Sequence, residues 1–204
     1  MKLYKKTAAV LTAFVIGVVP FFAEAPLAYD SELSVYDSSA PDKDKEGCYE
    51  IYTADQLAWL AVRCNVDHET DFKAKIMQDI EFNPGEVNSK DESRRKWTPI
   101  GSGDVNFVGE IDGQGHKITG LYCTGGKLAG LVGYNHGIIK NLGIENSYIF
   151  STTDSSELAY SGSFAAVTKD GGYIENCYSN ARVGSNYISG GLCGVIGGSA
   201  NLKN

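Results

Sequence analysis

The sequence predicts a mainly β protein, a right-handed parallel β-helix (a solenoid) with an N-terminal capping α-helix. Three observations support this fold class. A short block of residues recurs along the chain, each recurrence holds a Gly or Asn at the same position, and the segments between blocks are apolar at every second residue. Repeats of about 20–50 residues are typical of solenoids, in which each coil buries its apolar face only by stacking on the next coil.

The closing block of each repeat places an apolar residue two positions before a Gly or Asn. Its four recurrences begin at Ile118, Ile139, Ile174 and Leu202, at intervals of 21, 35 and 28 residues. Their third positions are Gly120, Asn141, Asn176 and Asn204. Gly and Asn accept the left-handed backbone region most readily, so we predict a tight bend there in every coil. Stacked asparagine amides would form hydrogen bonds along the solenoid axis, in a ladder that ends at Gly120.

The opening block of each repeat places a large apolar residue two positions before a small one. The large residues are Phe107, Leu131, Phe164 and Leu192, and the small ones are Gly109, Gly133, Ala166 and Gly194. This pattern predicts that the large residues form a buried column, and that the small residues lie where neighbouring backbone leaves no room for a larger side chain. Segments such as 121–123 and 142–144 alternate between apolar and other residues, which indicates short strands. Frequent glycines after residue 100 argue against helices, since each mid-helix Gly costs about 1 kcal/mol.

A leucine-rich repeat is the competing solenoid. Its spacing is matched once, by Ile139, Leu142, Ile144 and Ile149. The same offsets counted from Ile174 give Cys177, Ser179 and Gly184, which do not fit. The β-helix is therefore favoured.

The N-terminus has the layout of a secretory signal peptide, which we place at residues 1–25. Three lysines precede an apolar run over residues 8–22, and small residues follow it. A transmembrane anchor is the alternative, but the run is shorter than the ~20 residues needed to cross a bilayer, and Pro20 interrupts it. The sequence therefore predicts an exported protein that does not contact the membrane after cleavage.

Residues 26–47 are rich in Asp, Ser, Glu and Lys, so we predict a flexible linker, followed by the solenoid over residues 48–204. Thr53-Ala54-Asp55-Gln56 is a capping box. It begins a helix with an apolar face of Leu57, Leu60, Ala61 and Cys64, which would cover the first coil. The sequence stops at a predicted bend without a second cap, so we expect a truncated solenoid whose last coil frays or self-associates.

The run from Phe107 to Leu121, with Gly130-Leu131-Val132-Gly133 and Ile139-Lys140-Asn141-Leu142, resembles the GLUG-motif repeats of bacterial secreted and surface proteins. These repeats are found in adhesin-like proteins and in non-catalytic regions of some immunoglobulin A proteases. The resemblance covers about residues 49–204 and departs from the family pattern at Gly162-Ser163-Phe164-Ala165-Ala166. It implies a secreted or cell-surface scaffold, without enzymatic activity, that binds an unidentified host, matrix or cell-surface protein or glycan.

A carbohydrate-active β-helix enzyme, of the polysaccharide lyase or hydrolase type, is the alternative function. Glu110, Asp112 and Lys140 fall on adjacent predicted coils and are its candidate residues. No catalytic, cofactor or metal site is otherwise predicted. His68-Glu69 lacks the second His of a zinc protease helix, and His116 and His136 lack a third ligand. Residues 112–115 resemble a calcium-binding turn but supply too few oxygens, so we interpret them as a simple turn.

The chain is acidic, with 18 basic and 25 acidic residues that become 15 and 24 after signal cleavage. This balance argues against nucleic acid as a partner. The one basic cluster of the mature chain lies in the polar loop 83–96, at Lys90, Arg94, Arg95 and Lys96. This loop is either a solvated excursion, which we favour, or a binding loop.

The chain has five cysteines, an odd number for an exported protein: Cys48, Cys64, Cys123, Cys177 and Cys193. Cys177 aligns with Leu121 and Leu142. Cys193 aligns with Val132 and Ala165, and Cys123 with Ile144. These three are interpreted as small apolar fillers of the interior, and Cys48 and Cys64 as the best candidates for a disulfide.

Tyrosines are frequent in the repeats: Tyr122, Tyr134, Tyr148, Tyr160, Tyr173, Tyr178 and Tyr187. Their rings could stack on sugars or pack against a protein. Strand propensity explains the same residues without a ligand.

Overall fold

A computed structural model describes residues 40–87, 89–153 and 157–203, all within one unit of the chain, Glu32–Asn204. The predicted signal peptide and residues 26–39 of the predicted linker lie outside the described residues. Within these, no helix has the length and apolar character needed to span a membrane.

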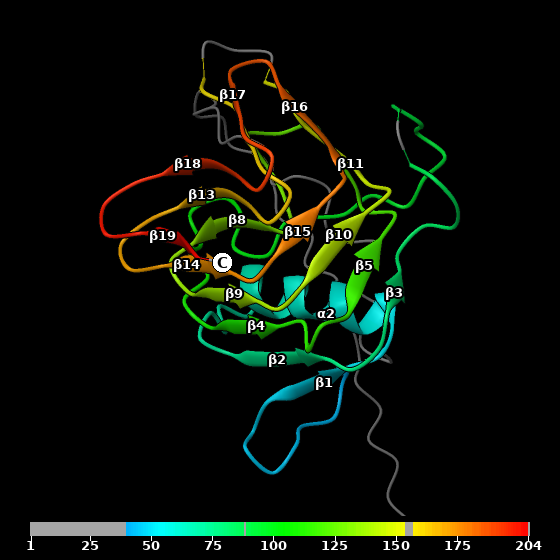
Figure 1. Cartoon of the computed structure of the whole chain (residues 1–204), viewed down its shortest axis with the longest axis vertical. Coiled ribbons are helices and arrows are strands. Elements are labelled where there is room, and N and C mark those ends of the chain that lie inside the picture. The colour runs from blue at the N-terminus through cyan, green and yellow to red at the C-terminus, as the bar shows by residue number, and fades with distance from the viewer. Residues whose placement is uncertain (1–39, 88, 154–156, 204) are drawn as a thin grey trace, which may run out of the picture. The chain divides into compact units, whose positions relative to one another are not determined.

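The fold is the predicted parallel β-helix, with five strands in each complete coil (Figure 1). The second coil holds β4 (Glu110–Asp112), β5 (Lys117–Thr119), β6 (Tyr122–Thr124), β7 (Leu128–Ala129) and β8 (Val132–Asn135). The third holds β9 (Ile138–Lys140), β10 (Gly143–Glu145), β11 (Tyr148–Ser151), β12 (Tyr160–Ser161) and β13 (Ala165–Thr168). The fourth holds β14 (Tyr173–Glu175), β15 (Tyr178–Ser179), β16 (Arg182–Ser185), β17 (Ile188–Ser189) and β18 (Cys193–Ile196).

Four further strands stack on these coils. They are β1 (Tyr49–Ile51), then β2 (Lys73–Ile76) and β3 (Ile80–Glu81) of an incomplete first coil that extends to Phe107, and β19 (Asn201–Lys203) after the complete coils. Equivalent strands of successive coils pair in parallel and form five sheets. One has the order β1-β2-β4-β9-β14-β19, and a second has the order β15-β10-β5-β3. The others are β16-β11-β6, β17-β12-β7 and β18-β13-β8.

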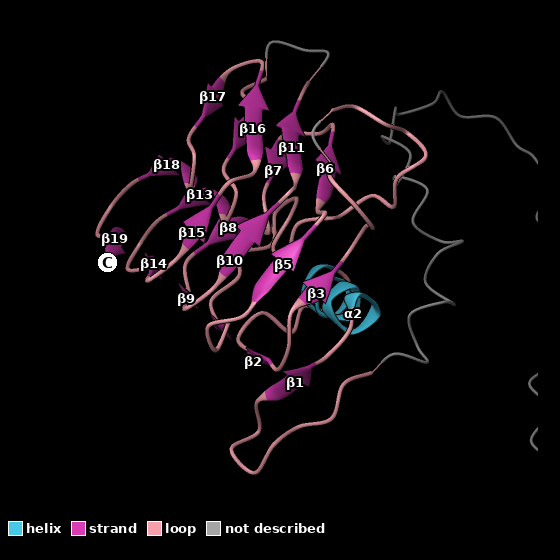
Figure 2. Ribbon diagram, turned by 45° about the vertical axis from the view of Figure 1, so that its right-hand side comes forward, coloured by secondary structure: helices cyan, strands magenta, loops and turns pink. Residues whose placement is uncertain are grey.

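The helix α2 (Ala54–Asn65) joins β1 to β2 and lies beside β1 and β3 (Figure 2). The predicted capping box is confirmed, because Thr53 Oγ1 accepts the N–H of Gln56 and Gln56 Oε1 accepts the N–H of Thr53, both at 3.2 Å. The predicted apolar face is buried, together with Ala58. Asn65 ties the end of the helix to the first coil, since its side chain donates to the carbonyl of Pro99.

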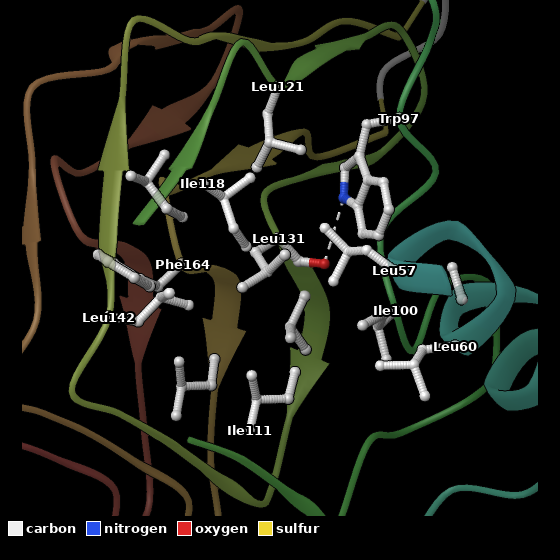
Figure 3. Close-up of a cluster of buried hydrophobic side chains, with 14 of the residues drawn as sticks. Leu57, Leu60, Trp97, Ile100, Ile111, Ile118, Leu121, Leu131, Leu142 and Phe164 are labelled. Atoms are coloured by element: carbon white, nitrogen blue, oxygen red, sulfur yellow. Dashed lines mark hydrogen bonds between the residues drawn. The ribbon is translucent and has the colours of Figure 1, made fainter. Parts of the chain in front are cut away.

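The apolar interior is built from rows of aligned side chains, one from each coil. Ile111, Ile139 and Ile174 form one such row on the six-stranded sheet, and all three are almost completely buried. In Figure 3, Leu57 and Leu60 of the helix lie beside Ile100 of the first coil. Trp97 closes this part of the core, and its indole N–H donates to the backbone carbonyls of Gly130 and Leu131.

In each of two predicted columns, the residue predicted to come first is not aligned with the others. Ile139, Ile174 and Leu202 are aligned as predicted, but the row continues to Ile111, and Ile118 is aligned with Ile144 instead. Successive members of the row are therefore 28, 35 and 28 residues apart. The error arose because one coil can hold the same pattern twice. In the second coil Ile111 and Ile118 each come two residues before a Gly, and in the third coil Ile139 and Ile144 each come two residues before an Asn.

The opening block shows the same kind of error. Val132, Ala165 and Cys193 are aligned, which places Leu131, Phe164 and Leu192 in one region of successive coils, as predicted. Phe107, in contrast, is aligned with Asn135, and Ile100 takes the position beside Val132.

The predicted bends are confirmed at Asn141 and Asn176, whose φ angles are 53° and 49°. Their amides also form the predicted ladder, because Asn176 Nδ2 donates to Asn141 Oδ1 at 2.8 Å. The ladder then continues to Asp112, since Asn141 Nδ2 donates to Asp112 Oδ1 at 3.0 Å. Gly120 does adopt a positive φ of 73°, but it occupies the other bend of the coil and does not end the ladder.

Two substitutions at Asn141 separate backbone strain from the lost hydrogen bonds. Both Asn141→Gly and Asn141→Val remove the ladder amide, but only valine is strained at a positive φ. We expect the valine variant to be less stable than the glycine variant by on the order of 1–3 kcal/mol. Urea unfolding midpoints of the two purified variants measure the difference, and equal midpoints would show that the bend does not require a left-handed residue.

The five cysteines are all free thiols, so Cys48 and Cys64 do not form the disulfide considered above, although both are buried. Cys177 lies beside Leu142 and Cys193 beside Ala165, as predicted. Cys123 is aligned with Ile149, so its predicted alignment with Ile144 is wrong. Leu121 is likewise not aligned with Cys177, because the prediction matched the wrong part of the second coil, as it did for Ile118. Burial raises the pKa of Cys123 to about 12, so this thiol is an inert filler of the interior.

Residues 40–47, which the sequence places in the linker, form a turn that packs on β1. Lys43 forms an antiparallel bridge with Tyr49, and the Asp44 carboxylate accepts the N–H groups of Glu46 and Cys48. Polar composition alone misses this turn, because its partners lie in the strand that follows.

Candidate ligand-binding groove

The three candidate residues of the alternative enzymatic function do meet on the outer face of the six-stranded sheet. Lys140 Nζ lies 2.7 Å from Glu110 Oε1 and 3.4 Å from Asp112 Oδ2. The row that contains Asp112 and Lys140 alternates in charge along the whole sheet: Glu50, Lys75, Asp112, Lys140, Glu175 and Lys203. Opposite charges on adjacent strands stabilise the sheet.

The electrostatics of this trio favour a structural role. Burial opposes ionisation of Asp112, but hydrogen bonds from the Gln114 N–H and the Asn141 amide, together with Lys140, hold the pKa of Asp112 below its ordinary value. The hydrogen bond to Glu110 raises the pKa of Lys140. A general acid needs a raised carboxyl pKa and a lysine base needs a lowered pKa, so both shifts have the wrong sign for proton transfer.

The lowered pKa of Asp112 predicts a loss of stability in acid. Its contribution is present above the unfolded-state pKa of about 3.9 and is lost as the pH falls through the lower, folded-state pKa. Urea midpoints at pH 7 and pH 3 should therefore differ less in Asp112→Asn than in the unmodified chain. Asp104→Asn, at an exposed carboxylate, is the matched control. An unchanged pH dependence of stability in Asp112→Asn would show that Asp112 does not contribute to the loss of stability in acid.

The basic loop pairs with its own surroundings. Arg95 forms an ion pair of 2.7 Å with Asp55 of the helix, and its guanidinium lies over the ring of Phe82. Arg94 pairs with Asp91, at 3.1 Å. Lys90 and Lys96 both pair with Glu92, at 3.3 and 3.0 Å. Because these basic side chains are paired within the chain, a solvent-exposed loop without a ligand is favoured over a binding loop.

The histidines do not come together in the described part of the chain. His116 and His136 contact different carboxylates, Asp79 and Asp170, on different coils. One group of possible ligand atoms is formed by Asp44, Glu46 and Cys48. The ammonium of Lys75 lies 2.7 Å from Asp44 and 3.1 Å from Glu46, so it already pairs with both carboxylates.

The tyrosines separate into groups with different surroundings. Tyr122 and Tyr148 stack on each other, with ring centroids 6.1 Å apart, on the β16-β11-β6 sheet. Tyr178 packs over Gly143 and donates its hydroxyl to Glu145. Only Tyr134 and Tyr160 of the predicted set line the same concave surface.

This surface, which we name the corner groove, lies outside the corner between the β17-β12-β7 and β18-β13-β8 sheets. It has a volume of about 280 Å³. Its apolar and aromatic lining is formed by Tyr134, Leu158, Tyr160, Val167 and Val195. Its charged lining is formed by Lys127, Glu157 and Lys169.

The groove follows the solenoid axis, because aligned residues of three successive coils line one of its walls. On this wall Val167 is aligned with Tyr134 and Val195. Tyr160 lines the opposite side of the groove, and its aligned neighbours Leu128 and Ile188 do not line the groove. Neighbouring strands are about 4.8 Å apart, so the same surface repeats at that interval along the axis.

A row of glycines makes this corner possible. Gly130, Gly162 and Gly190 occupy it in successive coils, directly after the aligned residues of β7, β12 and β17. A Cβ atom on Gly162 would overlap with the carbonyl oxygen of Ala165, and one on Gly190 with that of Cys193. Only a residue without a side chain lets the backbone turn this tightly.

Both lysines of the groove are exposed, and neither has an ion-pair partner among the described residues. The hydroxyls of Tyr134 and Tyr160 also have no protein hydrogen-bond partner in this part of the chain. These groups are therefore available to a ligand. The sequence analysis included the two tyrosines but missed Lys127, Glu157, Leu158 and Lys169, which lie in the turns beside the strands and outside the repeated blocks.

No protein-family model matches the chain. A curated protein of Evansella cellulosilytica, named "Putative Gly-rich membrane protein", is 29% identical over 143 residues, which make up 68% of this chain and 15% of that protein. A crystal structure from Bacteroides ovatus, described as "a putative immunoglobulin A1 protease", is similar with a TM-score of 0.48 and 19% identity. That similarity covers 79% of this chain and 66% of the other. This chain thus spans less than two thirds of each.

Proposed function

We propose that this chain is the binding scaffold of an exported bacterial protein, secreted or held at the cell surface, and that it has no enzymatic activity. The corner groove is the observation that carries the proposal. Its aromatic and apolar lining comes from three successive coils and lies beside two lysines without acidic partners among the described residues. Such a surface suits a protein or glycan of a host, matrix or neighbouring cell.

The repeats and the N-terminus support export and binding. Residues 49–204 resemble GLUG-motif repeats, which occur in adhesin-like proteins. The lysines and apolar run before residue 25 have the layout of a signal peptide.

The carbohydrate-active enzyme is the less favoured function. Hydrolysis of a glycosidic bond usually requires two carboxylates on opposite sides of that bond, and Glu157 is the only carboxylate among the described residues that line the groove. The trio of Glu110, Asp112 and Lys140 is charged and mutually paired, and lies on another sheet.

Incubation of the purified chain with a panel of acidic and neutral polysaccharides tests the absence of catalysis. We expect no new reducing ends and no unsaturated products, because the pKa shifts of Asp112 and Lys140 have the wrong sign for proton transfer. Product formation that disappears in Asp112→Asn would show that the chain is an enzyme and would overturn the proposed scaffold function. Retention of the chain on an array of glycans and matrix proteins tests binding independently.

A further inference from the structure

We propose that the corner groove binds an anionic polysaccharide, a polymer of uronic acid residues whose chain runs along the solenoid axis. This inference rests on the proposed function and names the class of ligand.

The first argument is charge complementarity. Most basic side chains of the described residues pair with nearby acids, such as Arg63 with Asp67 and Lys117 with Glu145. Lys127 and Lys169 are exposed, line the same groove and have no such partner among these residues. They lie on different coils and different walls, so two carboxylates of one polymer could be bound at separate positions. The charge-assisted hydrogen bonds that lysine forms with carboxylates are stronger than neutral ones.

The second argument is the surface between the lysines. Tyr134 and Tyr160 are half-buried, with their rings against an apolar floor of Leu128 and Val167, which are 8% and 3% exposed. Pyranose rings combine an apolar C–H face with hydroxyl groups at the rim. Tyrosine offers the matching combination of a flat apolar ring and a polar hydroxyl.

The third argument is direction. Tyr134, Val167 and Val195 line one wall at aligned positions of three successive coils, so a polymer lying along the axis meets an aromatic or apolar side chain at each coil. An acidic peptide is a less suitable occupant, because extended peptides are usually bound through main-chain hydrogen bonds at a sheet edge. The middle strands β12 and β13 line the groove but are paired on both sides, so they offer no edge.

Affinity electrophoresis and calorimetry with polygalacturonate, dextran and poly-glutamate test the proposal. We expect polygalacturonate to bind, the neutral dextran not to bind, and poly-glutamate to bind far more weakly. Binding should weaken as salt is added, since part of it is electrostatic. Equal, competing binding of poly-glutamate would identify the occupant as an acidic peptide and overturn the proposal.

Paired variants locate the site. Lys127→Ala/Lys169→Ala should lower the affinity by about a hundredfold, on the scale of two charge-assisted hydrogen bonds. Lys45→Ala/Lys73→Ala is the control, because both lysines are exposed, lack an ion pair among the described residues and change the net charge equally. Tyr160→Ala should lower the affinity by about tenfold or more, whereas Tyr52→Ala, at a residue that is 41% exposed and lies outside the groove, should not. Circular dichroism checks folding.

The outcomes distinguish this inference from the proposed function. An equal loss of affinity in the two lysine pairs would mean diffuse attraction and would overturn the groove as the site. Failure to bind any acidic polysaccharide, with binding to another surface ligand retained, would overturn the inference alone. Cleavage of the polysaccharide would instead overturn the scaffold function.

Discussion

Phe164→Ala is expected to lower the free energy of unfolding by about 3–5 kcal/mol, the largest effect predicted for a single substitution in this chain. The ring is fully buried, and Figure 3 shows it beside Leu142 and Leu131 in the core. Truncation removes the packing of the ring in the main hydrophobic core, and the cavity that it leaves adds to the loss. Urea unfolding followed by circular dichroism measures the loss.

Val108→Ala is the control for this prediction, because Val108 is 49% exposed and should change stability by less than about 0.5 kcal/mol. A loss in Phe164→Ala no larger than in the control would mean that the third coil is not packed as described. Repeat structures can also unfold in parts. The same variant should therefore increase hydrogen exchange most in the coils next to Phe164.

Gly120→Ala is expected to lower the free energy of unfolding by about 2–5 kcal/mol, from two causes that add. Gly120 has a φ of 73°, which costs an L-residue about 1–2 kcal/mol. A Cβ there would also overlap with the carbonyl oxygen of Asn83, and such overpacking typically costs about 1–3 kcal/mol. Asn83 cannot easily move away, because its amide is hydrogen-bonded to the carbonyls of Gly120 and Arg95 at 2.9 Å each.

Gly115→Ala separates the two causes. Gly115 has a φ of 84°, but a Cβ atom there would have no neighbour within 4 Å. Its substitution should therefore cost only the backbone strain, about 1–2 kcal/mol. Equal urea midpoints for Gly120→Ala and Gly115→Ala would show that the contact with Asn83 is not tight.

Much of the fold is predictable from local sequence. The helix is recognised by the Thr53–Gln56 capping box and its apolar face, and the bends by Asn141 and Asn176. Rows of apolar residues at alternate positions indicate the strands. These features depend on near neighbours in the chain, so one sequence is enough to predict them.

The alignment of coils is harder to predict. Ile118 and Ile111 precede different bends of one coil, and only the pairing of strands shows that Ile111 belongs with Ile139. The groove is harder still, because Lys127 and Lys169 come together through the corner between two sheets. Their distance along the chain and the irregular turns around them hide this proximity.

Lysine footprinting tests the central claim of a ligand-binding corner groove most directly. The chain is treated with an amine-acetylating reagent with and without polygalacturonate, and modification is read at each lysine by mass spectrometry. We predict that the polymer protects Lys127 and Lys169 and leaves Lys45 and Lys73 as reactive as before. Polygalacturonate bound with Lys127 and Lys169 still fully reactive would contradict the account.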